Sequence, residues 1–309
     1  MHPGKSKSVL ISGGSGLIGM HLTSLLLEKG YTVSHLSRKS GQFGRVRVYR
    51  WDPEKKIADH ALTGEFDYII HLAGAGIGEK RWTRKRKSEI LSSREDSAKF
   101  LFDIVKKNNI GLSAFISASG TGYYGTAVNA KSFDENDPPG NDFLGMVCKR
   151  WEEAADKFSA EGIRTVKIRT GVVLAGNGGI LEQLSRPFRY GLVIRMGSGR
   201  QYMPWIHISD LCRIYFKALE DTQMSGAYNA VAPENVTHNE FMKELASVNH
   251  RKIILPPVPG FMVKLLLGEM ADIVIKGNRV SAEKILSAGY SFEFPDLRSA
   301  LNDIYSRQT

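Results

Sequence analysis

The sequence predicts an α/β protein: a Rossmann-like doubly wound parallel sheet with a smaller, mostly helical C-terminal domain. Over residues 1–170, short apolar runs alternate with segments of helical periodicity, a pattern typical of a parallel sheet with helices on both faces. The alternation then stops, and residues 171–199 are rich in glycine while residues 233–309 contain mainly helical patterns. We therefore expect one domain over 1–170, to which 200–232 return, and a smaller domain formed by 171–199 and 233–309. The smaller domain is expected to cover the crevice at the ends of the strands.

The composition is that of an ordinary globular protein with a basic surface. Of the 309 residues, 42% are hydrophobic and 24% are charged, which supports a sizeable core. The formal net charge of +10 favours anionic ligands, nucleotides among them. Nucleic acid is a weaker hypothesis, because the chain has no recognised nucleic-acid-binding module and its basic residues are mostly scattered. We therefore expect a small-molecule substrate and no nucleic acid.

Cysteine usage and the apolar segments indicate a cytoplasmic protein. Cys148 and Cys212 are the only cysteines; they lack metal-ligand spacing and are too few for a disulfide framework, which favours a reducing compartment. Residues 1–8 are polar and basic, which does not fit a secretory signal. Residues 258–275 are apolar, but three charged residues interrupt them, so packed helices are expected there. No metal and no membrane partner are expected.

A glycine-rich turn follows the first predicted strand. Residues 9–12 form a short apolar run, and residues 13–19 hold four glycines ahead of a helical segment. This is the context of a dinucleotide fingerprint, because glycines let the backbone approach a pyrophosphate and the helix N-terminus faces its charge. The spacing fits Gly-x-Gly-x-x-Gly from Gly14 and Gly-x-x-Gly-x-x-Gly from Gly13 equally well. The residues expected to hold the pyrophosphate are Gly13, Gly16, Leu17, Ile18 and Gly19.

The end of the second predicted strand, residues 31–36, distinguishes between two dinucleotides. An NAD site has an acidic residue about 20 residues past the glycines, which binds the ribose 2′-hydroxyl. This chain has Ser37, Arg38 and Lys39 there instead. A hydroxyl and two cations suit a 2′-phosphate, and the guanidinium of Arg38 is able to fork onto it and stack on the adenine. We therefore predict that the first domain binds NADP(H); the alternative is that Arg38 and Lys39 are solvated loop charges.

Two further strands end in turns that we expect beside the cofactor. One apolar strand, from residue 66, runs into a small-residue turn at 72–74, and another buried strand covers residues 112–119. In a doubly wound sheet, the turns at the carboxyl ends of the parallel strands border the ligand crevice. The residues predicted to contact the cofactor from these strands are Leu72, Ala73, Gly74 and Ser117.

The remaining elements follow from the same patterns. A basic run over residues 81–87 opens a helix that reaches about residue 108, and it is either a solvated helix face or a contact for a phosphate or nucleotide substrate. Thr237 is the expected N-cap of a helix over residues 238–248. Further strands are predicted at 45–49, 164–169 and 227–231, and further helices at 144–161, 181–190 and from 211 onward.

Several motifs resemble those of the extended short-chain dehydrogenase/reductases, the nucleotide-sugar epimerase-like group. They are the glycine motif, His71-Leu72-Ala73-Gly74, Ser117-Ala118-Ser119 with Tyr124-Gly125, the segment from Trp205 to Leu211, and Tyr228-Asn229. Two more are similar to motifs of an epimerase-family, cell-division-inhibitor-like subfamily, namely Tyr123-Tyr124-Gly125 and Cys148-Lys149-Arg150-Trp151-Glu152. The resemblance covers nearly the whole chain. It implies NADP(H) binding and hydride transfer at a carbonyl or hydroxyl of a small molecule such as a sugar nucleotide.

The catalytic pair of that family is missing from this chain. The family places Tyr-x-x-x-Lys near the start of a helix, where the tyrosine transfers a proton and the lysine lowers its pKa and holds the nicotinamide ribose. When the family pattern is aligned on Glu152, Leu144 and Cys148 take these two positions. No Tyr-x-x-x-Lys occurs between Ser119 and Arg169.

Three residues are the candidates to replace the missing pair. Ser119 matches the family's hydroxyl that hydrogen-bonds the substrate oxygen, and Thr121 is the alternative if the loop is one residue longer. Tyr123 and Tyr124 both offer a phenol; Tyr123 is preferred because the family pattern makes Tyr124 structural. Lys149 is the candidate cation.

Two classes of function follow from these observations. The intact cofactor motif favours an enzyme, an NADP-dependent oxidoreductase or epimerase acting as a monomer or homodimer. The missing tyrosine and lysine favour the alternative, a non-catalytic NADPH-binding sensor or regulatory protein.

Overall fold

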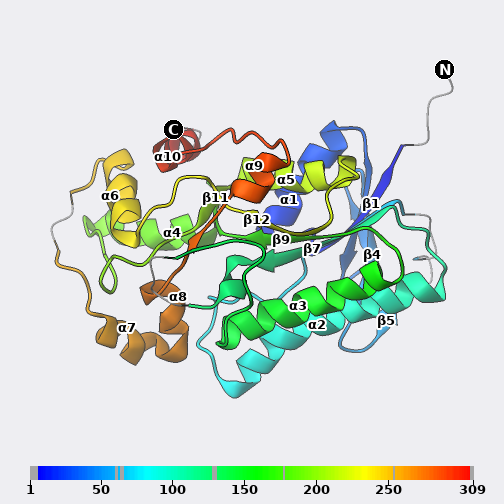
Figure 1. Ribbon diagram of the computed structural model, residues 1–309, viewed down its shortest axis with the longest axis horizontal. Coiled ribbons are helices and arrows are strands. Elements are labelled where there is room, and N and C mark those ends of the chain that lie inside the picture. The colour runs from blue at the N-terminus through cyan, green and yellow to red at the C-terminus, as the bar shows by residue number, and fades with distance from the viewer. Residues whose placement is uncertain are drawn as a thin grey trace.

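The computed structural model describes residues 6–59, 62, 66–126, 131–176, 178–252 and 255–306. Its centre is a sheet in the order β12-β9-β7-β6-β1-β2-β4-β3, with β5 also paired to β4 (Figure 1). From β12 to β4 every pairing is parallel, whereas β3 and β5 run antiparallel to β4. The predicted Rossmann-like parallel sheet is therefore confirmed. Its strands are β1 (Ser8–Ser12), β2 (Thr32–Ser37), β3 (Gly41–Phe43), β4 (Val46–Asp52), β5 (Ile57–Ala58), β6 (Tyr68–His71), β7 (Ala114–Gly120), β9 (Thr165–Thr170) and β12 (Gly226–Ala230).

Alternating side chains explain why both faces of the sheet are covered. On β1, Val9 and Ile11 belong to the core that contains α1 and α5, while Leu10 belongs to the core that contains α2 and α3. All three are buried, because successive side chains of a strand point to opposite faces. Figure 1 shows α2 and α3 side by side along one face. The covering helices are α1 (Leu17–Glu28), α2 (Arg84–Lys107), α3 (Phe143–Ala160) and α5 (Ile208–Glu220).

A second core forms from residues that follow β9 in the chain. It joins side chains of 174–205, such as Leu174 and Trp205, to Phe241 and Leu301 from later helices. The segment around Tyr290 does not pack in this second core. It packs on the α1 and α5 side of the sheet, although the sequence assigns it to the smaller domain. The proposed division into two domains therefore stays a prediction. The elements of this part are β10 (Val172–Leu174), α4 (Gly179–Ser185), η3 (Arg186–Tyr190), β11 (Trp205–His207), α6 (His238–Val248), α7 (Gly260–Leu267), η4 (Gly268–Ala271), α8 (Asp272–Ile275), α9 (Glu283–Ser287) and α10 (Leu297–Ser306).

Two short elements connect this part to the loop after β7. β13 (Arg279–Val280) pairs in parallel with β8 (Ser132–Phe133), and Asn278 donates from Nδ2 to the carbonyl oxygen of Gly125 at 2.8 Å. The loop itself begins with a 3₁₀ turn, η2 (Thr121–Tyr124). The C-terminal part is therefore hydrogen-bonded directly to the loop that carries the predicted site tyrosines.

Most predicted boundaries agree with the structure. Thr237 caps α6 in a full capping box with Glu240, as expected. The helix predicted over 181–190 is divided into α4 and η3, and the third predicted strand is extended as β4. The short antiparallel strands β3 and β5 are absent from the prediction, because strands of two or three residues carry no readable periodicity.

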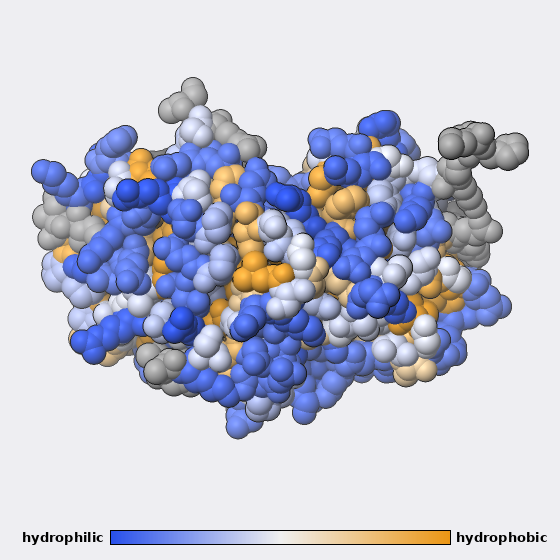
Figure 2. Space-filling view, turned by 45° about the horizontal axis from the view of Figure 1, so that its top comes forward, coloured by the Kyte–Doolittle hydropathy of each residue, from blue (hydrophilic) through white to orange (hydrophobic). Residues whose placement is uncertain are grey.

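The surface is mostly hydrophilic on the side drawn in Figure 2, with apolar side chains showing in separate patches. In the part of the chain that the structure describes, no helix is both long and apolar enough to cross a membrane.

Candidate functional site

The glycine turn after β1 is built by close backbone approaches. Gly13 adopts a φ of +74°, and a Cβ there would lie 2.9 Å from the backbone nitrogen of Ala73. A Cβ at Gly14 would lie 2.4 Å from the His35 ring, and one at Gly19 would lie 2.5 Å from the Gly13 carbonyl oxygen. A Cβ at Gly16 meets the same oxygen at 3.3 Å. Close packing therefore explains the glycines of both motifs, the one that begins at Gly13 and the one that begins at Gly14. Gly13 is also required for its positive φ, which other residues rarely adopt.

The first turn of α1 offers its backbone amides to a ligand. Gly16 is the N-cap, and no side chain caps the helix. The first turn also carries no acidic residue. Uncapped N–H groups and the positive end of the helix dipole attract an anion, so the amides of Leu17, Ile18 and Gly19 are donors for a phosphate beside the turn.

The end of β2 lies next to this turn. β1 and β2 are paired in parallel with Ser12 opposite Leu36, so Ser37 and the two residues after it follow at the same edge of the sheet. Ser37 is half-buried, whereas Arg38 and Lys39 are exposed. Among the described residues, neither cation has an ion pair, and no acid follows β2 to repel a phosphate. Both are therefore available to an anionic group of a ligand.

The turn after β6 is held in place by a buried histidine. The Nδ1 of His71 is 2.6 Å from the hydroxyl of Ser12, and its Nε2 is 3.1 Å from the hydroxyl of Ser97. Burial lowers the pKa of His71 to about 4, so the ring is neutral at physiological pH. The amides of Leu72 and Ala73 donate to Ser12 at 3.0 and 3.4 Å. These bonds fix the turn that Gly13 touches.

Ser117 and Gly74 are both predicted to contact the cofactor, and their surroundings differ. Ser117 lies beside His71 in the pairing of β6 with β7, but its side chain is buried and donates to the carbonyl oxygen of Ala118 at 3.0 Å. Gly74 follows the turn and packs against a side chain of α2. Contact of either residue with a cofactor stays a prediction.

A buried charged network lies at the end of β7. The hydroxyl of Ser119 donates to Glu152 Oε1 at 2.7 Å. Arg169 forks onto the same carboxylate, with Nε 2.8 Å from Oε1 and Nη2 2.9 Å from Oε2. Its guanidinium lies 3.4 Å from the ring centroid of Tyr123 and donates to the Tyr124 hydroxyl at 3.0 Å. The structure thus brings two predicted residues, Ser119 and Tyr123, together around an ion pair.

The ion pair is a part of the site that the sequence does not reveal. Glu152 enters the sequence comparison only as the end of the family pattern, and Arg169 carries no motif. Arg169 is one of two charged residues of β9, with Lys167, so its burial at only 3% exposed distinguishes it and its sequence context does not.

The two tyrosines of the loop have different surroundings. The Tyr124 hydroxyl donates to Asn229 Oδ1 at 2.7 Å and is buried, which agrees with a structural role. Tyr123 is half-buried. Burial raises its pKa, and the charge of Arg169 opposes this only in part. The phenol of Tyr123 is therefore protonated at neutral pH and able to donate a proton.

The position of Lys149 does not fit the expected role of site cation. Lys149 lies on the exposed face of α3, where its Nζ is 3.8 Å from Glu153 Oε1. Its neighbour Cys148 is the residue that faces the loop after β7: a Cβ at Gly120 or Gly122 would lie 3.8 Å from its Sγ. Consecutive helical residues point about 100° apart, so both side chains do not share this face. Burial raises the pKa of Cys148 to about 12, which keeps the thiol neutral.

Comparison with known proteins agrees with this geometry. A family model described as the NAD dependent epimerase/dehydratase family matches residues 9–231. The chain belongs to this family. A second model, described as a domain of unknown function (DUF1731), matches residues 258–304. The resemblance to extended short-chain dehydrogenase/reductases is thereby confirmed.

Three relatives illustrate the match. The epimerase family protein SDR39U1 of Mus musculus is 37% identical over 300 residues, which are 96% of this chain and 99% of the mouse protein. The crystal structure of human SDR39U1 (isoform 2) with NADPH has a TM-score of 0.86 at 32% identity, covering 97% of this chain and 99% of that chain. The crystal structure of the nucleoside-diphosphate sugar epimerase from Corynebacterium glutamicum has a TM-score of 0.77 at 32% identity, covering 96% of this chain and 58% of that chain.

In this epimerase-family chain, the motif that begins at Trp205 is structural. The Nδ1 of His207 accepts from the amide of Ser209 at 3.2 Å and so caps α5. Asp210 accepts from the Tyr290 hydroxyl at 2.6 Å and from the amides of Glu293 and Phe294 at 2.9 and 3.0 Å. The motif therefore fastens the C-terminal segment to the sheet domain.

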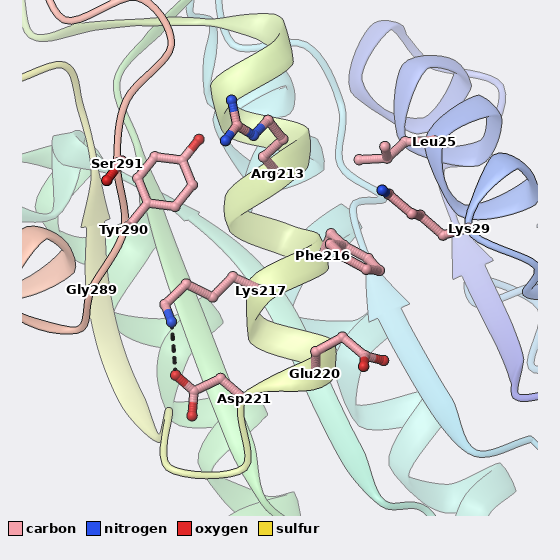
Figure 3. Close-up of a pocket in the computed structure, with 10 residues that line it drawn as sticks. All are labelled: Leu25, Lys29, Arg213, Phe216, Lys217, Glu220, Asp221, Gly289, Tyr290 and Ser291. Carbon is pink, nitrogen blue, oxygen red and sulfur yellow. Dashed lines mark hydrogen bonds and ion pairs between the residues drawn. The ribbon is translucent and has the colours of Figure 1, made fainter.

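A hollow of about 700 Å³ lies apart from this site, between α1, α5 and the loop at 289–291 (Figure 3). Most of its charges are already paired: Lys217 with Asp221 at 2.9 Å, Arg213 with Glu293 at 3.2 Å and Glu220 with Lys7 at 3.3 Å. The remaining cation, Lys29, lies over the ring of Phe216. It also lies at the carboxyl ends of α1 and α5, whereas the glycine turn meets the amino end of α1. We assign no function to it.

Proposed function

We propose that this chain binds NADP(H) and catalyses oxidation, reduction or epimerisation at a hydroxyl-bearing carbon of a small molecule, with a sugar nucleotide as the substrate class. The observation that carries the proposal is the juxtaposition at one sheet edge of an uncapped helix N-terminus, a glycine turn and Arg38, a cation with no ion pair among the residues that the structure describes. This combination provides for both the pyrophosphate and the additional phosphate of the dinucleotide.

The residues along the edge fit the cofactor from its adenosine end. Gly13, Gly16 and Gly19 allow the turn to close tightly, because an added Cβ would lie 2.9, 3.3 and 2.5 Å from backbone atoms. The amides of Leu17 and Ile18 provide donors for the pyrophosphate. Ser37, Arg38 and Lys39 are proposed to bind the 2′-phosphate. Leu72, Ala73, Gly74 and Ser117 border the path toward the nicotinamide. The NADPH in the human SDR39U1 crystal structure supports this choice of cofactor.

The residues at the end of β7 are proposed to act on the substrate oxygen. The bound cofactor supplies hydride exchange at its nicotinamide ring. The single proton of the Ser119 hydroxyl is committed to Glu152, so toward a substrate hydroxyl its oxygen would act as a hydrogen-bond acceptor. Tyr123 is proposed to donate a proton to a substrate carbonyl oxygen or to return it, and the guanidinium of Arg169 over its ring fixes its position.

A sugar nucleotide is proposed because of the named activity of a relative. The Corynebacterium glutamicum protein described as a nucleoside-diphosphate sugar epimerase is 32% identical to this chain. The basic run at 81–87 is a proposed contact for the diphosphate of such a substrate, since it opens α2 near the turn after β6.

The first experiment is a titration of the purified protein with NADPH and NADH, read by calorimetry. Wild-type protein is expected to prefer NADPH at least tenfold, and Arg38→Ala is expected to remove that preference while leaving NADH binding unchanged. Arg45→Ala is the matched control, because Arg45 is equally exposed but precedes β4 at the opposite edge of the sheet. Equal affinity of the wild-type protein for both dinucleotides would contradict the proposed cofactor.

The second experiment screens sugar nucleotides and simple carbonyl compounds for oxidation of NADPH. With an active substrate, Tyr123→Phe is expected to lower kcat by about 10²–10⁴ without changing the Kd for NADPH, because only a proton donor is removed. Absence of turnover with every substrate, with tight NADPH binding retained, would reject the enzyme and favour the sensor.

A further inference from the structure

Arg94 on α2 is a buried cation without a counter-ion. It is 6% exposed, and among the described residues it makes no ion pair. Its Nη1 donates to the carbonyl oxygen of Ile90 on the same helix at 3.0 Å, and its Nε has no hydrogen-bond partner. The guanidinium lies over the ring of Trp151 at 5.0 Å from the centroid. A buried charge is ordinarily paired, so this arrangement requires an explanation.

The guanidinium lies between two turns at the carboxyl edge of the sheet. A Cβ at Gly74, in the turn after β6, would lie 3.0 Å from Arg94 Cζ. On the other side, Arg94 is near enough to Cys148 for its charge to oppose the rise in that thiol's pKa. Cys148 in turn contacts the loop after β7 through Gly120 and Gly122. Arg94 therefore reaches the edge where a doubly wound sheet binds its ligands.

The surroundings of Arg94 leave its charge uncompensated. Burial lowers its pKa to about 10, which still leaves the side chain charged at neutral pH. Arg86 is the other charged side chain that acts on it, and it is also positive. By contrast, Arg86 is paired with Glu79 and Glu89 at 3.2 and 2.9 Å. A cation kept in this state, beside a ligand-binding edge, is available to an oxygen that arrives with the ligand.

We propose that Arg94 is the cation of the site and that its guanidinium donates hydrogen bonds to an oxygen of the nicotinamide half of the dinucleotide. The hydroxyls of the nicotinamide ribose are the class of acceptor that fits. Arg94 would supply from α2 the positive charge that neither Cys148 nor Lys149 supplies from α3. This inference rests on the proposed function, since it assumes that the dinucleotide lies along this edge.

The test compares two ligands that share the adenosine half. NADPH carries the nicotinamide half, and adenosine 2′,5′-bisphosphate lacks it. Arg94→Met is expected to lower the affinity for NADPH at least tenfold and to leave the affinity for the bisphosphate unchanged. Arg94→Lys is expected to recover part of the loss, because it restores the charge but not the fork. Arg150→Met, which removes an exposed arginine of α3, is the control and should change neither affinity.

A melting curve without ligand separates binding from structure. Arg94→Met is expected to melt at the wild-type temperature or above it, because the substitution removes an uncompensated buried charge. A purely structural arginine would give a lower melting temperature and equal losses for both ligands. If Arg94→Met does not fold, Arg94→Gln, which stays polar but neutral, is used for the same comparison.

Three results would overturn the inference. Wild-type affinity of the Arg94 variants for NADPH overturns it and leaves the proposed function standing, and so does an equal loss for both ligands. Failure of the wild-type protein to bind either ligand overturns the proposed function, and the role of Arg94 with it.

Discussion

The two ends of the proposed cofactor crevice are built in different ways. At the adenosine end, the turn after β1 and the first turn of α1 use backbone atoms, and glycines allow the close backbone approaches of the turn. At the nicotinamide end, side chains from three elements form a network: Ser119 from β7, Glu152 from α3 and Arg169 from β9. A site made of backbone depends on a short stretch of chain, whereas a site made of side chains depends on tertiary packing.

The difference predicts separate consequences for mutations at the two ends. Changes in the network of Ser119, Glu152 and Arg169 should reduce stability and turnover while the affinity for the adenosine half is retained. Changes in the glycine turn should reduce cofactor affinity at a smaller cost in stability.

The largest expected effect on stability is that of Glu152→Gln. Loss of the carboxylate leaves Arg169 buried without its partner, which costs about 3–5 kcal/mol in the free energy of unfolding. Glu153→Gln is the matched control, because Glu153 is exposed and its contact with Lys149 is a long 3.8 Å; a change of about 0.5 kcal/mol or less is expected. Urea unfolding at pH 7 measures both. Equal stability of the two variants would show that the ion pair of Glu152 with Arg169 does not stabilise this part of the fold.

Gly13→Ala is expected to have an intermediate effect on stability and a large effect on binding. Its φ of +74° and the nearby backbone of Ala73 make a Cβ costly, by about 1–3 kcal/mol. Movement of the turn should also lower the affinity for NADPH at least tenfold. Gly30→Ala is the control, since Gly30 has a φ of +83° but no atom within 4 Å of an added Cβ. It should show backbone strain alone, with NADPH affinity unchanged; a parallel loss of affinity in both variants would contradict a local role for Gly13.

The effect that is smallest at pH 7 is a pH dependence contributed by His71, which grows only as the solution becomes acidic. Its pKa is about 4 in the folded protein against about 6.5 when unfolded, so below pH 6.5 the unfolded state binds the additional proton. Stability is therefore lost as the pH falls from 6.5 to 4, by about 1.4 kcal/mol per pH unit from this residue, and no such change is expected above pH 7. His71→Asn should show a shallower decrease in urea unfolding measured at several pH values. An identical slope would mean that the ring is not buried in its neutral form.

The same contrast explains how much the sequence predicts. The sheet and the glycine turn are readable because strand periodicity and glycine spacing are local. The turn residues Leu72–Gly74 follow from the position of β6, although the serines that hold His71 do not. Contact of the predicted residues with NADP(H) stays a prediction.

The other end was harder to predict for a physical reason. Glu152 and Arg169 are 17 residues apart, on α3 and β9, and meet only when the helix packs on the sheet. The structure does not support Lys149 as the cation of the site. Lys149 is the next residue after Cys148 on α3, and this one step along the helix points its side chain to the solvent. Arg94 has no motif, and only its burial without a counter-ion distinguishes it from the exposed arginines of the chain.

The most direct measurement is a crystal structure of the protein with NADPH. The account predicts the pyrophosphate on the amides of Leu17 and Ile18, the 2′-phosphate on the guanidinium of Arg38, and the nicotinamide ribose within hydrogen-bonding distance of Arg94. A crevice without nucleotide at saturating NADPH, or a 2′-phosphate in solvent with Arg38 turned away from it, would contradict the account.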